Sequence, residues 1–290
     1  MTALKTITNY LSLIKFSHTV FALPFAMIGY FLAVKITGNI LDVHKLILIL
    51  FCMIFARSSA MAFNRYIDKE FDKKNPRTAL REIPAGIISS HAALFFVIVS
   101  SLLFITVTYF INTICLYLSP VALAVILGYS FTKRFTALCH VILGIGLSLA
   151  PIGAYLAVTG KFDWLPLYFS FAVLFWVSGF DIIYALQDEL FDKANNLFSI
   201  PAWLGVSRAL ILSKIFHSLT IIFLFYAGMT APFGIIYWIG FAAFISLLIY
   251  QHTLIKPTDL SKVNLAFATT NGVASILFAT FVIMDLFIHK

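Results

Sequence analysis

Asn64-Arg65-Tyr66-Ile67-Asp68-Lys69-Glu70-Phe71-Asp72-Lys73-Lys74-Asn75-Pro76-Arg77-Thr78 is a charged segment in an otherwise apolar chain. Three acidic and five basic side chains lie within these 15 residues. Asn64, Asp68 and Asp72 recur at every fourth position, so on a helix their side chains lie along one face. Two carboxylates one turn apart can bind a hard divalent cation, and the basic residues beyond them suit a phosphate that the cation bridges. The segment therefore predicts a metal and phosphate site.

The composition places this segment in a membrane protein. Hydrophobic residues make up 61% of the 290 residues and charged residues 11%, whereas about a quarter of the residues in soluble domains are charged. The mean hydropathy is +0.99. A net charge of +8 would suit nucleic acid in a soluble protein, but here basic cytoplasmic loops and phosphate binding explain it better. We expect lipid bilayer contact and no nucleic acid.

The hydropathy pattern predicts an all-α membrane protein with about nine transmembrane helices of about 20 residues each. The expected spans lie near residues 13–34, 46–67, 91–110, 113–131, 138–158, 164–186, 209–228, 233–251 and 264–287. Connections between them are short, so we interpret residues 1–290 as a single polytopic domain. The three cysteines and seven histidines show no metal-ligand spacing, which argues against a haem or multi-histidine site.

Lysine and arginine in the loops predict the orientation of the chain. With a cytoplasmic N-terminus, the loops near residues 68–90, 132–137, 187–207 and 252–263 share one side and carry most of the basic residues. We therefore expect an integral protein of a bacterial inner membrane, with its polar loops capping the cytoplasmic side.

A second acidic segment, Asp181 to Lys193, matches the first. Asp188-x-x-Phe191-Asp192-Lys193 aligns with Asp68-x-x-Phe71-Asp72-Lys73, and Tyr184 takes the place of Asn64. Further on, Ile200-Pro201-Ala202 repeats Ile83-Pro84-Ala85. This indicates an internal repeat with halves near residues 46–90 and 164–207. On a continuous helix Asp181, Tyr184, Asp188 and Asp192 would share one face.

A lone D-x-x-x-D is more often a pair of solvated loop charges. Here the two acidic segments, together with Glu82 in the loop after the first, hold eight of the twelve acidic residues. Carboxylates brought close together repel one another unless a cation neutralises them, and Mg²⁺ is characteristically shared between a few carboxylates and substrate phosphates. Basic and phenolic side chains predicted on the same side would bind the phosphate; they are Arg77, Arg81, Lys133, Arg134 and Tyr129.

Two ionisable residues lie deeper, within apolar spans. Such residues are costly in a membrane and are functional candidates by default. Asp181 precedes Asp188 by seven residues, about two turns, and its structural alternative is pairing with a buried cation such as Arg57. Arg57 precedes Asn64 by the same interval, and its guanidinium would suit the carboxylate of an acceptor.

These motifs resemble the UbiA superfamily of intramembrane aromatic prenyltransferases. The resemblance rests on N-x-x-x-D-x-x-x-D at Asn64–Asp72, on Asn75-Pro76-Arg77-Thr78, on Y-x-x-x-K at Tyr129 and on D-x-x-Y-A-x-Q-D-x-x-x-D at Asp181–Asp192. The sequence around Asp181 is most similar to the 4-hydroxybenzoate polyprenyltransferase-like branch, including members assigned to futalosine-route menaquinone synthesis.

The resemblance implies a helix bundle around a central cavity and Mg²⁺-dependent prenyl transfer from a polyprenyl diphosphate to an aromatic acid, 4-hydroxybenzoate or a dihydroxynaphthoate, in respiratory quinone synthesis. It implies metal ligands at Asp68, Asp72, Asp188 and Asp192. It implies catalytic roles for Asp181, Asp68 and Asp188. Substrate-binding residues would be Asn64, Arg57, Arg77, Tyr129, Lys133, Arg134 and Tyr184.

Other functions remain open at this point. An ion-coupled transporter also uses apolar repeats and intramembrane charges, although its site would lie nearer the midplane. Haem is an alternative acceptor within the same superfamily. A CDP-alcohol transferase shares membrane aspartate clusters, but its D-G-x-x-A-R element is missing from this sequence.

Overall fold

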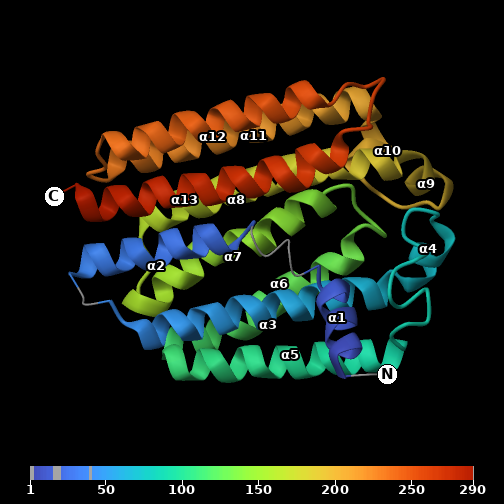
Figure 1. Ribbon diagram of the computed structural model, residues 1–290, viewed down its shortest axis with the longest axis horizontal. Helices are drawn as coiled ribbons and strands as arrows, with labels where there is room; N and C mark the ends of the chain where they lie inside the picture. Colours follow the sequence, from blue (N-terminus) through green and yellow to red (C-terminus); the bar gives the residue numbers. More distant parts are fainter. Residues whose placement is uncertain (1–2, 16–20, 39–40, 290) are drawn as a thin grey trace. The chain divides into compact units, whose positions relative to one another are not determined.

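The computed structural model describes residues 3–15, 21–38 and 41–289 (Figure 1). Helices account for most of these residues, and the one β contact among them is an isolated bridge between Lys256 and Asp259. The prediction of an all-α membrane protein is confirmed.

Eight helical segments within the described ranges are long and apolar enough to cross a membrane. They are α3 (Val43–Ile67), α5 (Ser90–Ile111), α6 (Thr113–Thr132), α7 (Cys139–Thr159), α8 (Trp164–Ala185), α11 (Val206–Thr230), α12 (Ile235–Leu254), and the π-helical turn η3 (Leu265–Thr270) joined to α13 (Asn271–Ile288). Their bounds lie within a few residues of eight predicted spans. The count of nine is not confirmed.

The first predicted span, residues 13–34, is wrong in its bounds. Helix α1 (Ala3–Leu13) ends where this span was expected to begin, and Lys15 has a positive φ of 46°. Helix α2 (Leu23–Thr37) begins with Pro24 in its first turn, where proline lacks only a hydrogen bond that the helix does not make. With 15 residues it rises about 22 Å, less than the roughly 30 Å of a bilayer core.

The chain forms two compact units, the first made of Met1–Thr19 and Ile47–Phe131. It contains α1, most of α3, the short helix α4 (Lys69–Lys74), α5 and nearly all of α6. Its core joins α1 to the loop after α4 and to α3 and α5, through Leu13, Ala62, Ile83, Ile88, Ala93 and Val97. The Ser12 hydroxyl also donates a hydrogen bond to Glu82, so α1 and this loop are fastened together.

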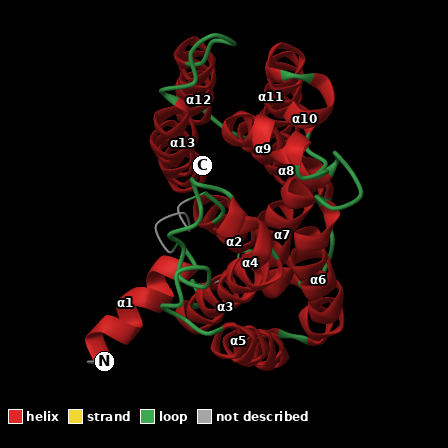
Figure 2. Cartoon of the chain, turned by 90° about the vertical axis from the view of Figure 1, so that its right-hand side faces the viewer, coloured by secondary structure: helices red, strands yellow, loops and turns green. Residues whose placement is uncertain are grey.

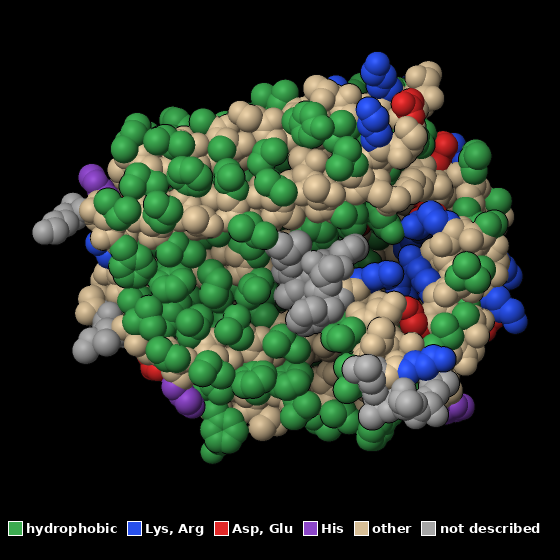
Figure 3. Space-filling view, viewed as in Figure 1, with side chains coloured by type: hydrophobic (Ala, Val, Ile, Leu, Met, Phe, Trp, Pro, Cys, Tyr) green, Lys and Arg blue, Asp and Glu red, His purple; other side chains and the backbone are tan. Residues whose placement is uncertain are grey.

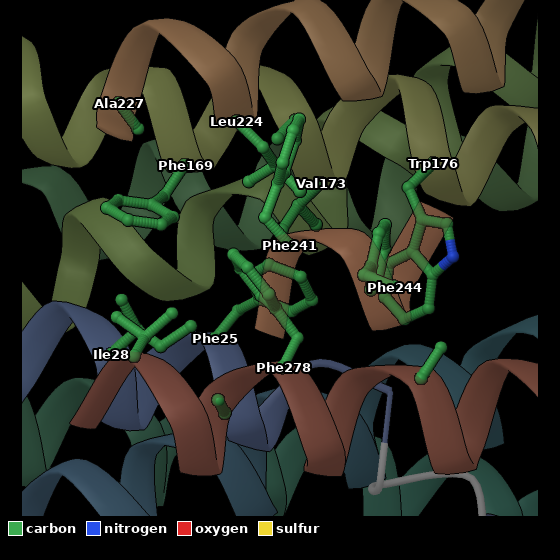
Figure 4. Packing of buried hydrophobic residues seen from close by; sticks show 14 of the residues in the cluster. Phe25, Ile28, Phe169, Val173, Trp176, Leu224, Ala227, Phe241, Phe244 and Phe278 are labelled. Carbon is green, nitrogen blue, oxygen red and sulfur yellow. The ribbon is translucent and has the colours of Figure 1, made fainter. Parts of the chain in front are cut away.

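The second unit comprises Val20–Leu46 and Thr132–Lys290. Helix α8 lies at its centre and packs against both α7 and α11. The fully buried Trp176 of α8 packs against the ring of Phe180 on the same helix. It also packs against Phe25 and Phe244, and the Phe278 ring lies next to both of these (Figure 4). This aromatic core fixes α8, whose C-terminal end carries the second acidic segment.

Close backbone contact supports the same packing. A Cβ placed on Gly29 of α2 would lie 2.1 Å from the Pro151 carbonyl oxygen of α7. A Cβ on Gly144 of α7 would lie 2.4 Å from the Leu174 carbonyl oxygen of α8. Small residues at helix crossings let backbones approach closely, which is a major source of packing energy between membrane helices.

The surface of the long helices suits lipid. Large hydrophobic side chains are exposed along them, among them Phe95, Phe110, Tyr117, Ile235 and Met229. Hydrophobic side chains also cover much of the face drawn in Figure 3, over α12 and α13 in particular. A soluble protein would not expose so much apolar surface. The chain is an integral membrane protein.

Short helices occupy the polar segment after α8. The 3-10 turn η2 (Leu186–Asp188) leads into α9 (Glu189–Ala194), and α10 (Ile200–Leu204) follows (Figure 2). In the first unit, α4 holds the corresponding place after α3. The two acidic segments therefore sit at the ends of spans, as predicted.

Candidate functional site

The first acidic segment keeps its helical hydrogen-bond spacing across the end of a helix. Helix α3 ends at Ile67 and Asp68 is the N-cap of α4, yet the amides of Asp68 and Asp72 still bond the carbonyls four residues earlier. The Asn64 amide donates to Asp68 Oδ2 at 3.1 Å. Asn64 and Asp68 thus touch one another as the i, i+4 spacing predicts.

Asp72 lies buried on α4 and is held from the following loop. Arg81 Nη1 lies 2.7 Å from Asp72 Oδ1, and the Thr78 hydroxyl donates to the Asp72 carbonyl at 3.1 Å. Asp72 Oδ2 is buried and has no hydrogen-bond partner within the described part of the chain. A buried carboxylate oxygen without a donor is costly, and a cation would satisfy it.

The second acidic segment departs from the predicted continuous helix. Helix α8 ends at Ala185, and the 3-10 turn η2 separates it from α9. Asp181 and Tyr184 lie on α8, whereas Asp188 ends the 3-10 turn and Asp192 lies on α9. The four residues therefore do not lie on one continuous helix, which was the condition for one shared face.

Asp192 is fully buried on α9, where it forms an ion pair with one side chain and accepts a hydrogen bond from another. Lys133 Nζ lies 2.7 Å from Asp192 Oδ1, and the Ser199 hydroxyl donates to Oδ2 at 2.8 Å. Burial alone would lower the pKa of Lys133, but the neighbouring Asp192 outweighs it, so the pKa of this ammonium is raised. The lysine is therefore held in its charged form.

The two acidic segments share a local geometry. Asp68 and Asp188 have nearly the same backbone conformation, with φ and ψ of −89° and 4° and of −103° and 2°. Each caps a six-residue helix whose fourth residue is a buried aspartate paired with a cation at 2.7 Å. The internal repeat itself stays a prediction, and this likeness supports it.

Asp181 has a partner that the sequence did not predict. Its Oδ2 lies 2.7 Å from Nδ1 of His140, which belongs to α7. The histidine was missed because a single histidine in an apolar span carries no motif. No role was predicted for Thr78, which donates to the Asp72 carbonyl, or for Ser199, which donates to the Asp192 carboxylate.

Arg57 lies on α3, and its guanidinium contacts the segment that follows α1. Its Nη2 donates to the Lys15 carbonyl at 3.1 Å. Its Nε is buried and lacks a partner among the residues that the structure describes. An unpaired N–H on a buried guanidinium is able to bind a carboxylate.

The remaining predicted residues lie close to these groups along the chain. Arg77 follows α4, Tyr129 lies in the last turn of α6, and Arg134 is the neighbour of Lys133. The Tyr184 ring packs against Phe267, which η3 presents, with the centroids 4.3 Å apart. The substrate-binding roles of all four remain predictions.

Each acidic segment has residues that fit magnesium binding completed by a substrate. The described chain holds no cluster of three His, Cys, Asp or Glu residues that would bind a metal by itself. Mg²⁺ is commonly bound by one or two carboxylates, with waters and substrate phosphates filling the other positions. Each acidic segment supplies two aspartates, and Asp72 contributes a buried oxygen without a donor.

Comparison with known proteins establishes the family. The model of the UbiA prenyltransferase family matches residues 22–281. The chain belongs to this family. It is thus a prenyltransferase, and the choice between an enzyme and an ion-coupled transporter is decided for the enzyme.

Relatives agree with the UbiA assignment. The 4-hydroxybenzoate octaprenyltransferase of Nitrosospira multiformis is 31% identical over 247 residues, which are 82% of each chain. The apo structure of a UbiA homologue from Aeropyrum pernix aligns with a TM-score of 0.83 and 30% identity, over 92% of this chain and 98% of that one. A UbiA homologue from Archaeoglobus fulgidus bound to GPP and Mg²⁺ shares the fold, with a TM-score of 0.72, 22% identity and coverage of 96% and 99%.

Proposed function

We propose that this prenyltransferase moves a polyprenyl group from a polyprenyl diphosphate to an aromatic acid, 4-hydroxybenzoate or a dihydroxynaphthoate, in respiratory quinone biosynthesis. The observation that carries the proposal is the pair of acidic segments, each with a buried aspartate beside a basic side chain. The name of the Nitrosospira relative supports the acceptor class. The ligands of the Archaeoglobus homologue support the donor class.

The diphosphate is the part of the donor that these segments suit. Asp68, Asp72, Asp188 and Asp192 would hold Mg²⁺, which supplies positive charge that stabilises the departing diphosphate. Arg77, Lys133 and Arg134 bind the same oxygens directly, with Asn64, Tyr129 and Tyr184 as hydrogen-bonding neighbours. Preorganised positive charge lowers the barrier most where negative charge grows during the reaction.

The chemistry requires a bond to break and another to form. The allylic C–O bond breaks with its electron pair leaving on the diphosphate, and a ring carbon of the acceptor attacks the resulting allyl cation. The ring then loses its proton and becomes aromatic again. The carboxylate of Asp181 stabilises the cation or accepts the proton, while apolar side chains of the family's central cavity exclude water.

The function is tested with purified protein in liposomes. We expect a prenylated product and release of diphosphate from a polyprenyl diphosphate when an aromatic acid is supplied. EDTA should abolish both, and added Mg²⁺ should restore them. A panel of acceptors that includes 4-hydroxybenzoate, dihydroxynaphthoate and haem identifies the acceptor by mass spectrometry. Product formation with haem alone, or with none of the panel, would contradict the proposal.

Arg57 is proposed to bind the acceptor carboxylate. Replacing it in Arg57→Met keeps an apolar stem of similar length and removes the charged donor. We expect KM for the aromatic acid to rise by about 10- to 100-fold, the cost of one charged hydrogen-bonded pair, while KM for the prenyl diphosphate stays unchanged. Steady-state kinetics with each substrate varied in turn measures this.

Two controls sharpen the Arg57 experiment. Arg208→Met removes an exposed arginine from α11 and should leave both constants unchanged. The methyl ester of the acceptor should be a poor substrate for the unaltered enzyme, and Arg57→Met should discriminate far less between acid and ester. An equal rise in both KM values would show that Arg57 acts on the structure rather than on the acceptor.

The orientation remains part of the proposal. The acidic segments are proposed to face the cytoplasm of a bacterium, with the chain in its inner membrane. The basic residues of the surrounding loops support this side.

A further inference from the structure

His140 joins two parts of the second unit that both bear on the proposed chemistry. It lies in the first turn of α7, with its ring almost fully buried. One ring nitrogen, Nδ1, is 2.7 Å from Asp181 Oδ2 on α8. The other, Nε2, accepts a hydrogen bond from the backbone N–H of Ile200 at 3.3 Å. Ile200 is the first residue of α10.

These two contacts assign the tautomer of the ring. A nitrogen that accepts an N–H carries no proton of its own, so the proton of the neutral imidazole lies on Nδ1. Nδ1 therefore donates to the Asp181 carboxylate. A histidine whose second nitrogen is fixed by a backbone group has a set orientation, which in turn sets the position of the carboxylate.

The same backbone N–H belongs to a segment that also holds Asp192. The Ser199 hydroxyl donates to Asp192 Oδ2 at 2.8 Å and accepts from the Ala202 amide at 3.3 Å, which caps α10. Ser199 and Ile200 are adjacent in the chain. Asp192 is therefore linked to Asp181 through the Ser199 hydroxyl, the Ile200 amide and the His140 ring. The proposed diphosphate-binding carboxylate and the proposed catalytic carboxylate are thereby held by one element.

We propose that His140 is the positioning residue of Asp181. It anchors one carboxylate oxygen, Oδ2, against α10, while the other, Oδ1, has no hydrogen-bond partner in the described part of the chain. About a fifth of the Asp181 side chain is exposed, compared with 4% of His140. The anchored carboxylate keeps its free oxygen available to the reacting group. The inference rests on the proposed function, since it gives Asp181 its orientation for that reaction.

A pair of isosteric variants separates the two hydrogen bonds of the ring. In His140→Asn the side-chain amide nitrogen lies about where Nδ1 lies, so a donor to Asp181 is retained. In His140→Gln the amide reaches the place of Nε2, so an acceptor for the Ile200 N–H is retained and the donor to Asp181 is lost. Both variants remove the ring, and they differ in which partner they keep.

We expect His140→Gln to lower kcat by about 10- to 100-fold, the usual cost of misplacing a reacting group by about 1 Å. KM for the prenyl diphosphate should change less than twofold, because Asp192 and Lys133 are untouched. His140→Asn keeps the donor to Asp181 but loses the bond to Ile200, so its kcat should fall less than that of His140→Gln. His217→Gln, a change at another buried histidine of the same unit, should leave kcat unchanged.

Combining His140→Gln with Asp181→Asn tests whether His140 acts through Asp181. If it does, the double variant is no slower than Asp181→Asn alone. Additive losses, or equal kcat for the Gln and Asn variants at position 140, would overturn the proposal. Thermal unfolding in detergent shows whether a slow variant is merely unfolded, and a kcat loss that tracks a lower unfolding midpoint would also overturn it.

Failure of this inference is distinguishable from failure of the proposed function. An unaltered enzyme that forms prenylated aromatic acid, together with a fully active His140→Gln, contradicts only the role of His140. An unaltered enzyme that forms no such product contradicts the proposed function and the inference with it.

Discussion

Replacing Asp192 by asparagine is expected to lower kcat for prenyl transfer about 1000-fold or more. The change keeps the shape of the side chain but removes a charge that Lys133 and Ser199 contact at 2.7 and 2.8 Å. It removes a proposed ligand of Mg²⁺ and the carboxylate that forms an ion pair with the Lys133 ammonium. Losing one preorganised electrostatic contact typically costs a factor of about 100 to 1000, and here two are lost together.

The rate of prenyl transfer by Asp192→Asn is measured with radiolabelled prenyl diphosphate and a saturating concentration of the aromatic acid. The matched control is Glu189→Gln, on the same six-residue helix, whose carboxylate pairs with the exposed Lys193 at 2.6 Å. This control should keep at least about half of the activity, because surface pairs contribute little. Asp192→Asn should also need a higher Mg²⁺ concentration for half-maximal rate. A rate close to that of the unaltered enzyme would contradict the diphosphate-binding role.

Replacing Asp285 by alanine is expected to destabilise the protein more than any other single change considered. Asp285 is buried on α13 and accepts from two backbone amides at the start of α12, from Gly234 at 2.8 Å and from Tyr237 at 3.1 Å. It therefore caps a helix other than its own. Alanine would leave two N–H groups without an acceptor, at a cost of about 3 kcal/mol in the free energy of unfolding.

This loss corresponds to a midpoint of thermal unfolding about 5 °C lower. The midpoint is measured in detergent, from the loss of the folded peak in size-exclusion chromatography after heating. Asp285→Asn keeps one accepting oxygen and should fall between alanine and the unaltered protein. Asp259→Ala removes an exposed aspartate whose side chain bonds only Ser261 within the described chain, and should leave the midpoint unchanged. Equal midpoints for Asp285→Ala and Asp259→Ala would refute the capping role.

Eight of the spans could be located from the sequence because each is a local property. A run of about 20 apolar residues crosses a bilayer wherever it stands in the chain. The first span was misplaced for a local reason too. Its apolar composition continues through residues 13–34, but the helix breaks after Leu13 and restarts at Leu23, next to Pro24. Hydropathy does not detect such a break.

The acidic residues were also recognisable from the sequence, because the two copies repeat the same spacing. Their local conformation was predictable only in part. Asn64 and Asp68 contact one another as expected. The 3-10 turn at Leu186–Asp188 was not expected, since three residues of altered helix leave no mark on a pattern of carboxylates.

Hydropathy and motif spacing are local properties of the chain, so they were enough to predict membrane-spanning helices and two matched acidic segments. The partners of the carboxylates, in contrast, became known from the packing of the helices. Arg81 binds Asp72, Lys133 binds Asp192, and His140 binds Asp181 from 41 residues away. Such pairs depend on how helices pack, with Gly144 letting α7 approach α8, and contacts across a helix interface follow no period in the sequence.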